Sequence, residues 1–443
     1  MNITEVISAA GQPTRFSDVA LLHEYLAGGA PGGPPVYLSI GETWTEAAPG
    51  LTRLLAAPMD SHSHGYVISQ YGLPRLQQAL RRYIAEDHGL LDIAEPGVDF
   101  EVAVACSGTR NAMHDYARLL RDEAATGGPG GTSETTPVAY VFSPGWDYAG
   151  VFSACGYRVR HLPLSAADSH PCLDTLRRAL LGAEQPELAR GVIVINAQHN
   201  PTAVNWRPED VRAIIRMALT AQAAILIDDA YFAVHEPGIR PTNALHILLE
   251  ELGEVPVEER PPWLAVRSLG KQFNCNGWGI GSATGSVDLV DRLMNRAMFS
   301  RSFVGAVPLQ EAMASWIEDP ASQRYLEELR RDLAMKRAAV SEFLEQRLGY
   351  PPGTWRPGEC TTYLRFQVPP DYLAEPDAAA RFQRDCFQKT GVLFGLDPGT
   401  LDDMLPPSER RPPYMRVFLG PPLPTLMQAM QRLEHAGIGY ASI

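Results

Sequence analysis

A lysine set among small and apolar residues is the first feature of this sequence that can do chemistry. Lys271 lies in the stretch VRSLGKQFNCNGWGIG, residues 266–281, directly after an apolar run that predicts a buried strand. A partly desolvated lysine has a lowered pKa, and its neutral amine can attack an aldehyde. A surface lysine in a loop is the simpler explanation when Lys271 is considered alone. The residues that follow the other apolar runs distinguish the two explanations.

Two other apolar runs end in residues that suit a flat, anionic ligand. Ser107, Gly108 and Thr109 open a predicted helix, where free backbone N–H groups and the positive end of the helix dipole favour an anion. An N-cap alone would also explain these three residues. Trp146 follows the next run, where its ring can either stack on a ligand or pack at the rim of the core.

Hydrogen-bonding groups follow two further runs. Asn200 lies in a predicted turn and presents an amide. Asp228 ends an apolar strand, where an unpaired carboxylate is costly to bury, so we expect it to hold a cationic ring nitrogen. Its neighbour Asp229 is expected to be a solvated strand terminus, and Tyr231 adds a phenol.

These strand ends belong to an alternating pattern between residues 100 and 290. Short apolar runs alternate with helix-period stretches such as 111–125 and 208–222. This alternation predicts an α/β fold, with a parallel sheet covered by helices on both faces. Ligands bind beyond the carboxyl ends of the strands in such sheets, so the side chains described above should meet at one edge.

The chain changes character at about residue 308. A long amphipathic helix over residues 321–349, followed by short apolar strands and another helix, predicts a smaller α+β domain. We therefore expect an N-terminal arm with part of the small domain in residues 1–60, a large domain in 61–307, and the linking helix with the small C-terminal domain in 308–443. The Gly, Ser, Thr and Pro residues of 125–137 predict a surface loop.

Composition narrows the class of protein. The 443 residues are 45% hydrophobic and 20% charged, which is typical of a soluble globular protein with a sizeable core. A formal net charge of −13 argues against nucleic-acid or anionic-membrane partners. Six scattered cysteines without a C-x-x-C pair argue against a zinc site or a disulfide framework, so no metal is expected. Since neither a signal-peptide pattern nor a membrane-spanning run is present, a cytoplasmic location is expected.

Together the strand-end residues match the needs of one cofactor, pyridoxal 5′-phosphate. This cofactor requires a phosphate anchor, a stacking ring, a carboxylate for its pyridine nitrogen, donors for its 3′-oxygen and an amine for a Schiff base. The sequence resembles the fold-type I pyridoxal-phosphate enzymes of the class I/II aminotransferase family in SGTRNA, SPGWDY, AQHNPT, IDDAYF, SLGKQFNCNGWGIG and YMRVFLG, in this order. The resemblance runs from about Tyr37 to the end of the chain.

The resemblance implies the architecture and assembly of the family. The fold would have a large domain, with a mixed, mostly parallel sheet sandwiched by helices, and a small α+β C-terminal domain. The enzyme would be a homodimer with shared active sites, in which a tyrosine of the segment 65–80 reaches the phosphate of the partner subunit. Tyr66 is the first candidate for this tyrosine, and Tyr71 is the alternative, because Tyr66 is one residue farther from Gly72 than is usual.

The resemblance also implies a role for each matched residue. Lys271 would form the Schiff base and then act as the general base at the substrate Cα. Asp228 would keep the pyridine nitrogen protonated, so that the ring accepts the electrons of a Cα carbanion. Arg416 would grip the α-carboxylate of the amino-acid substrate with a bidentate fork. The other implied cofactor ligands are Ser107, Gly108, Thr109 and Ser268 at the phosphate, Trp146 on the ring face, and Asn200 and Tyr231 at the 3′-oxygen. The remaining implied substrate contacts are Gly41 and Arg301, of which Arg301 can equally serve the phosphate.

One position departs from the family pattern and leaves the reaction open. The family usually has Gly-x-Arg-x-Gly, whose arginine pairs with the phosphate, and this chain has GWGIG, with Gly279 in place of the arginine. Arg267 and Arg301 are the candidates to replace the missing charge.

The same scaffold supports several reactions at Cα or Cβ. The first prediction is an aminotransferase that acts on an amino acid. The alternative is a lyase or synthase that performs β/γ-elimination, replacement or C–C bond formation, for example on a sulfonium amino acid in specialised biosynthesis. A non-catalytic sensor that binds the cofactor is the third hypothesis, and the retained Lys271 argues against it.

Overall fold

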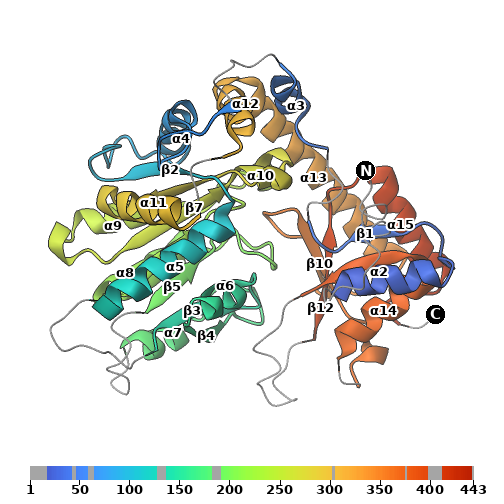
Figure 1. Cartoon of the computed structure of the whole chain (residues 1–443). Coiled ribbons are helices and arrows are strands. Elements are labelled where there is room, and N and C mark those ends of the chain that lie inside the picture. Colours follow the sequence, from blue (N-terminus) through green and yellow to red (C-terminus); the bar gives the residue numbers. More distant parts are fainter. Residues whose placement is uncertain are drawn as a thin grey trace.

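The computed structural model describes residues 17–41, 46–57, 64–126, 136–181, 191–301, 305–374, 377–397 and 412–441. They form two bodies, each built around one β-sheet (Figure 1). The helix α13 (Ala321–Gln346) runs between the two bodies. In these ranges no helix is long and apolar enough to cross a membrane.

The large sheet has seven strands in the order β2-β8-β7-β6-β5-β3-β4. β8 (Gly281–Gly285) runs antiparallel to both of its neighbours, and the other strands run parallel to one another. These are β2 (Glu101–Ala105), β3 (Val138–Ser143), β4 (Arg158–Pro163), β5 (Val192–Ile195), β6 (Ala224–Asp228) and β7 (Trp263–Ser268). The predicted α/β fold with a mostly parallel sheet is therefore confirmed.

β4 is the strand of this sheet that the apolar pattern does not predict. It lies at the edge of the sheet, where its sequence RVRHLP exposes Arg158 and buries Leu162. Most residues of β4 are only partly covered, so this strand does not need a continuous apolar run, unlike the fully buried β2 at the opposite edge.

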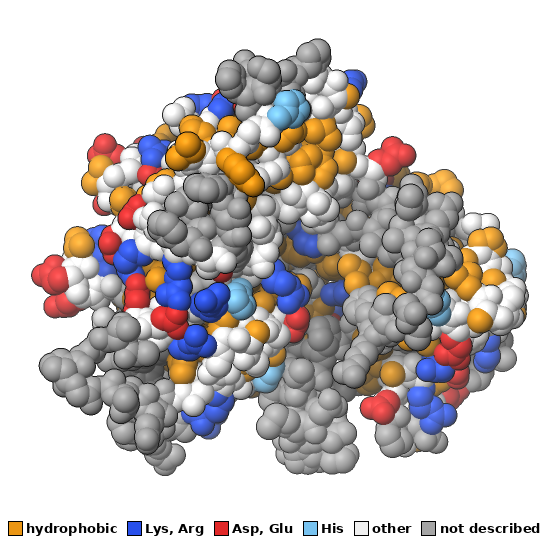
Figure 2. All heavy atoms as spheres, in the orientation of Figure 1, with side chains coloured by type: hydrophobic (Ala, Val, Ile, Leu, Met, Phe, Trp, Pro, Cys, Tyr) orange, Lys and Arg blue, Asp and Glu red, His pale blue; other side chains and the backbone are white. Residues whose placement is uncertain are grey.

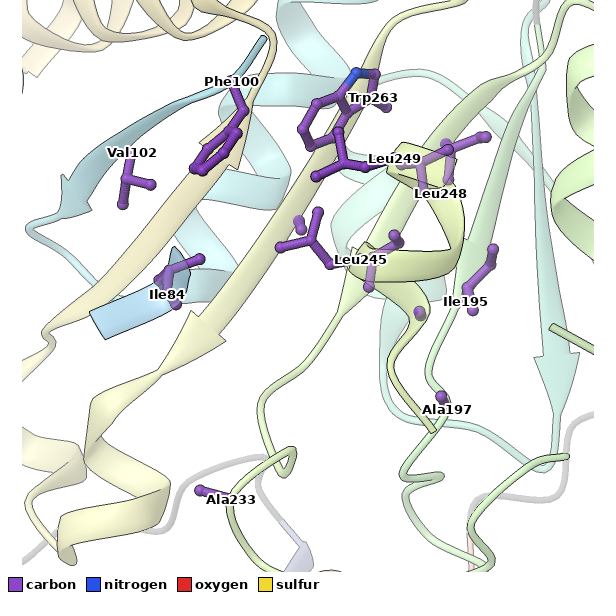
Figure 3. Packing of buried hydrophobic residues seen from close by; sticks show 14 of the residues in the cluster. Ile84, Phe100, Val102, Ile195, Ala197, Ala233, Leu245, Leu248, Leu249 and Trp263 are labelled. Atoms are coloured by element: carbon purple, nitrogen blue, oxygen red, sulfur yellow. The ribbon is translucent and has the colours of Figure 1, made fainter. Parts of the chain in front are cut away.

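Two layers of helices cover the large sheet. Alternate residues of a strand point to opposite faces, and in β6 Ile225 and Ile227 join one core while Leu226 joins the other. One layer consists of α4 (Pro74–Asp87), α7 (Leu173–Leu181), α8 (Pro208–Thr220) and α9 (Ala244–Gly253), and the other of α5 (Thr109–Thr126), α6 (Tyr148–Ala154) and α11 (Val287–Arg301). Figure 3 shows Leu249 of α9 directed toward Trp263 of β7 in the first of these cores.

The smaller body has a five-stranded sheet in the order β1-β11-β12-β10-β9. Its strands are β1 (Val36–Leu38), β9 (Trp355–Arg356), β10 (Tyr363–Gln367), β11 (Val392–Leu396) and β12 (Tyr414–Phe418). Its other elements are α2 (Ser17–Ala27), α14 (Ala378–Thr390), α15 (Leu423–His435) and the 3₁₀ helix η5 (Pro370–Tyr372). β1 pairs in parallel with β11, so segments from opposite ends of the chain share this sheet.

The remaining elements join the bodies or line the edge between them. They are α3 (Pro49–Leu55), α10 (Leu269–Phe273), α12 (Val307–Glu318), and the 3₁₀ helices η3 (Val257–Glu259) and η4 (Asn276–Trp278). α3 packs on α12, and Leu51 of α3 and Trp316 of α12 both belong to the core of the larger body. The domain boundaries at residues 60 and 307 stay a prediction. Most of the predicted surface loop, residues 127–135, lies outside the described residues.

Candidate active site

The carboxyl ends of the parallel strands β5, β6 and β7 face the smaller body. Figure 2 shows a hollow between the two bodies, with Lys and Arg side chains inside it. Arg416 of β12 donates from Nη1 to Asn200 Oδ1 at 3.2 Å, and Tyr231 OH donates to Tyr363 OH at 3.3 Å. Lys271 Nζ lies 5.8 Å from the ring centroid of Tyr231. The structure thus brings five residues into a single cluster. Four of them were predicted site residues, and Tyr363 was not; the four are Asn200, Tyr231, Lys271 and Arg416.

Lys271 lies in the short helix α10, directly after β7. Ser268 caps this helix, and its Oγ accepts a hydrogen bond from the Lys271 backbone N–H at 3.3 Å. Burial and, to a smaller extent, the nearby charge of Arg416 lower the pKa of the Lys271 amine to about 7. Because about half of the amine is then neutral at pH 7, Lys271 can act as a nucleophile or as a base near neutral pH.

Asp228 is a buried carboxylate at the end of β6. Its Oδ2 accepts a hydrogen bond from Tyr148 OH at 2.7 Å, and its Oδ1 accepts one from the Ala230 N–H at 3.1 Å. Burial raises the pKa of Asp228, and these two hydrogen bonds act in the opposite direction. Within the described ranges no lysine or arginine forms an ion pair with it. A buried carboxylate in this state fits a ligand that carries a protonated ring nitrogen.

Two residues that the sequence reasoning missed hold these strand ends together. Asn196, directly after β5, donates from Nδ2 to the carbonyl oxygen of Asp228 at 2.7 Å and accepts from the Asn200 N–H at 2.8 Å. Tyr148 lies two residues after Trp146 and begins α6. A polar residue at the end of an apolar run was the available signal for Asn196, and the SPGWDY motif contained the signal for Tyr148.

Arg416 lies on the face of the small sheet that turns toward the larger body, whereas its neighbours Met415 and Val417 point into the small core. Its guanidinium lies 4.3 Å from the ring centroid of Tyr363, and its Nη2 donates to the carbonyl oxygen of Ser39 at 3.3 Å. Its Nε is buried and has no acceptor among the described residues. An arginine with a buried unused donor fits a carboxylate ligand. Ser39 and Tyr363 carried no signal in the sequence.

Gly41 adjoins the same tyrosine. A Cβ added at Gly41 would lie 2.3 Å from Tyr363 OH. Any side chain at position 41 would therefore displace the Tyr363 ring, which contacts both Arg416 and Tyr231.

The predicted phosphate anchor lies at the start of α5, an 18-residue helix whose N-terminus favours an anion. Gly108 has φ +84° and Gly279 has φ +62°, both in the left-handed region that favours glycine. A Cβ added at Gly279 would approach no atom more closely than the Ser107 carbonyl carbon, at 3.7 Å. The turn that carries Gly279 thus lies directly beside the start of α5, and a Cβ at position 279 would be in ordinary van der Waals contact with the Ser107 and Gly108 backbone.

Arg267 does not replace the charge that Gly279 lacks. Its side chain is 2% exposed and is held in a buried network with Asp87, Tyr83 and Gln272. This network lies on the α4 side of the sheet, whereas α5 covers the opposite side. The side chain of Arg301, the other predicted replacement, lies outside the described residues.

The prediction that Asp229 is a solvated strand terminus is wrong. Asp229 is 2% exposed, and burial raises the pKa of its carboxyl to about 7. The chain turns back directly after β6, with the Phe232 N–H donating to the Asp229 carbonyl oxygen at 3.1 Å, and this turn covers the strand end.

The two candidate tyrosines for the partner subunit differ in their surroundings. Tyr71 OH donates to Asp291 Oδ1 at 2.8 Å within the same chain. Tyr66 is 74% exposed, and Ile68, two residues further on, is 92% exposed.

Trp146, the predicted stacking ring, contacts Tyr148 edge-on, with ring centroids 5.2 Å apart.

Lysine is rare in this chain, and that signal was available in the sequence. There are three lysines: Lys271, Lys336 and Lys389. Lys336 pairs with Asp332 within α13, and Lys389 is exposed in the last turn of α14. Lys271 is therefore the one lysine at the strand ends.

Among the described residues no group of three His, Cys, Asp or Glu side chains is placed to hold a metal ion.

Comparison with known proteins places this chain in a family. The family model described as aminotransferase class I and II matches residues 36–393. The chain is 25% identical over 306 residues to the probable N-succinyldiaminopimelate aminotransferase DapC of Mycobacterium tuberculosis, covering 67% of each chain. It is 27% identical over 391 residues to LL-diaminopimelate aminotransferase 2 of a Nostoc species, covering 86% of this chain and 85% of that one. The solved structure of N-succinyldiaminopimelate aminotransferase from Mycobacterium tuberculosis shares the fold, with a TM-score of 0.71 and 21% identity over 98% of this chain and 97% of that chain.

Proposed function

Since the chain belongs to the class I and II aminotransferase family, we propose that it transfers the amino group of an amino acid with pyridoxal 5′-phosphate as its cofactor. The observation that carries this proposal is the Lys271 amine, with a pKa of about 7, in one cluster with Tyr231 and Arg416. The matching relatives are aminotransferases. This supports amino-group transfer over the alternative lyase or synthase reaction.

The residues of the cluster fit this cofactor. When bound, pyridoxal phosphate supplies an aldehyde that condenses with amines and a protonated ring that accepts the electrons of a bond broken at Cα. Asp228 would hold the proton on the ring nitrogen, because its buried carboxylate needs a cationic partner. The proposed ligands of the other groups are Asn200 and Tyr231 at the 3′-oxygen, Trp146 at the ring face, and Ser107, Gly108, Thr109 and Ser268 at the phosphate.

Lys271 and Arg416 would act on the substrate. Neutral Lys271 Nζ can take the proton from the substrate Cα, because its pKa of about 7 leaves a large neutral fraction near neutral pH. Arg416 would bind the α-carboxylate with two parallel N–H groups, and Asn200 and Tyr363 hold the guanidinium in place. Gly41 and Arg301 are the other proposed substrate contacts.

The experiment that tests the function is a panel of amino donors with the purified, cofactor-loaded protein. The relatives are named for diaminopimelate derivatives, so the panel begins with LL-diaminopimelate and N-succinyl-diaminopimelate and includes the common amino acids and a sulfonium amino acid. Transamination would convert the donor to its oxo acid over many turnovers only in the presence of an oxo-acid acceptor, and without one it would stop at one equivalent per active site. Release of a leaving group without an acceptor would instead establish the lyase or synthase reaction.

We also propose a homodimer with shared active sites, and a cytoplasmic location. The exposed Tyr66 and Ile68 support an interface at the segment 65–80, and Tyr66 is the residue proposed to reach the phosphate site of the other subunit. Sedimentation analysis at several protein concentrations tests the assembly.

Replacing Gly279 with arginine is expected to tighten cofactor binding by about tenfold. A charge-assisted hydrogen bond to the phosphate contributes about 1.5–3 kcal/mol to binding, whereas the left-handed backbone at Gly279, which costs a non-glycine residue about 1–2 kcal/mol, destabilises the folded protein equally with and without the cofactor. The backbone cost therefore cancels from the cofactor-binding equilibrium, and a Cβ at position 279 fits without a clash, with its nearest atom at 3.7 Å. The dissociation constant is measured by titrating cofactor-free protein with pyridoxal phosphate and following its absorbance.

Gly279→Gln is the matched control for this substitution, because it carries the same backbone strain without the charge. If Gly279→Arg binds the cofactor no more tightly than Gly279→Gln, the phosphate does not lie opposite Gly279.

A further inference from the structure

A buried arginine clamps the turn that carries Lys271. Arg267 directly precedes Ser268, and Gln272 directly follows Lys271, so the two residues bracket the turn. Arg267 Nε donates to Gln272 Oε1 at 3.1 Å. Both side chains also meet Tyr83 of α4, because Arg267 Nη2 and Gln272 Nε2 donate to its OH at 3.1 Å and 3.0 Å. Three buried side chains, those of Arg267, Gln272 and Tyr83, thus form a closed ring of hydrogen bonds behind the turn, and we name this ring the clamp.

The clamp is anchored at the end of α4. Arg267 Nη1 lies 2.5 Å from Asp87 Oδ2 and 3.2 Å from His88 Nε2. Since His88 Nε2 accepts from the arginine, its Nδ1 carries the proton and donates to Asn243 Oδ1 at 2.8 Å. The pKa of His88 is lowered to about 4 by burial and by Arg267, so this imidazole stays neutral at neutral pH. Every part of the guanidinium therefore has a fixed partner.

The same guanidinium touches the segment after β6. It lies 4.9 Å from the ring centroid of Tyr83 and 5.0 Å from that of Phe232, the residue after Tyr231. The positive charge of Arg267 also lowers the pKa of the buried Asp229 carboxyl, whereas burial raises it by a larger amount. Arg267 thus connects the turn of Lys271 with the strand end of Asp228 and Tyr231.

We propose that Arg267 and Gln272 are positioning residues, which fix the turn over residues 268–271 and hold Lys271 Nζ in its sheltered place at the edge of the sheet. The proposal rests on the proposed function in one respect, that Lys271 is the reactive amine. Among the described residues, the hydrogen bonds of Arg267 and Gln272 reach neither Arg416 nor Asn200, so these two residues act on the cluster by fixing the turn of Lys271 and, through the contact of Arg267 with Phe232, the segment after β6.

The consequence is a change in the basicity of Lys271 when the clamp opens. Burial is the largest cause of its low pKa, and Arg416 is the next. Arg416 from β12 and Tyr231 after β6 lie near the Lys271 amine, and neither belongs to the clamp. A loosened turn admits water to the amine, which removes the effect of burial and raises the pKa.

The test measures the pKa of each lysine in cofactor-free protein. Trace labelling with an amine reagent between pH 5 and 11, followed by mass spectrometry of the peptides, gives a midpoint for Lys271 and, as internal references, for Lys336 and Lys389. We expect a midpoint near 7 for Lys271 in the unchanged protein. Gln272→Met removes the acceptor of Arg267 Nε but leaves the buried charge paired with Asp87. It should raise the Lys271 midpoint by about one pH unit or more, with the reference lysines unmoved.

Two further variants separate positioning from general stability. Tyr83→Phe removes the hydroxyl that joins Arg267 to Gln272, and it should move the Lys271 midpoint in the same direction. Arg337→Gln removes another buried arginine, which binds Glu236 and the carbonyl oxygens of Cys360 and Thr361, and it should lower the melting temperature without moving the midpoint.

If Gln272→Met and Tyr83→Phe both leave the Lys271 midpoint within about 0.2 pH unit of the parent, the positioning role is refuted. The same holds if Arg337→Gln shifts the midpoint as far as they do. The labelling requires no cofactor and no turnover. A negative result in the amino-donor panel would therefore refute the proposed reaction without refuting the positioning role of Arg267 and Gln272.

Discussion

Replacing Lys271 with alanine is expected to lower kcat by about 10,000-fold. Loss of a general base alone lowers a rate by about 100- to 10,000-fold, and the same residue would also supply the amine that binds the cofactor aldehyde. The two roles fall on one nitrogen, so the effect should lie at the upper limit. The measurement is the rate of oxo-acid formation from the best amino donor of the panel, in protein saturated with pyridoxal phosphate.

Two controls accompany this substitution. Lys389→Ala, which removes an exposed lysine of α14, should leave kcat unchanged. Added methylamine should restore part of the activity of Lys271→Ala, because a small amine can occupy the space of the lost side chain. A kcat within tenfold of the parent would show that another group performs the proton transfer.

Replacing Asp228 with asparagine is expected to lower kcat by about 100- to 1,000-fold, the range for loss of one preorganised charged or polar group in an active site. An amide cannot hold a proton on the ring nitrogen, so the ring accepts electrons less readily. The side chain keeps its size and can still accept the hydrogen bond from Tyr148. Steady-state kinetics with the same donor measure the effect, and a kcat that stays within threefold of the parent contradicts the assignment.

The stability of Asp228→Asn provides a second, independent measurement. Burial raises the pKa of Asp228 in the folded protein, so the folded state binds a proton more readily than the unfolded state. The charged carboxylate therefore destabilises the cofactor-free protein above its folded pKa, and this penalty disappears as the pH falls below the unfolded pKa. Cofactor-free Asp228→Asn should melt at or above the temperature of the parent at pH 8, and the difference should shrink at pH 4. A loss of stability at pH 8 would mean that the carboxylate has a cationic partner within the protein.

The strand-end residues show how much of this site could be predicted. A strand that is buried on both faces must consist mainly of apolar or small residues, so the inner strands β3, β5, β6, β7 and β8 and the fully buried edge strand β2 could be recognised in the sequence. The residues after these runs then share one edge by topology alone. β4 was missed because this edge strand stays partly exposed and therefore needs no continuous apolar run.

Other residues were missed because their roles depend on contacts across long stretches of sequence. Tyr363 and Ser39 meet Arg416 only because β1, β10 and β12 share one sheet and that sheet faces the larger body. Arg267 was a reasonable candidate for the phosphate by its position beside Ser268. The Arg267 side chain instead points toward α4, because it forms an ion pair with Asp87 at the end of that helix, more than a hundred residues away in the sequence.

By itself, the sequence determined the sheet, the lysine at its edge and the family, because these follow from local apolar runs and from the residue types that end them. The tertiary structure decided which side of the sheet each charged residue faces, and how far water is excluded from it. Asp229 is buried because the chain folds back over β6, and the pKa of Lys271 is low because its amine is buried and, to a smaller extent, because Arg416 of the smaller body lies near it. Burial and charge depend on every neighbour in space, so neither can be read from one stretch of sequence.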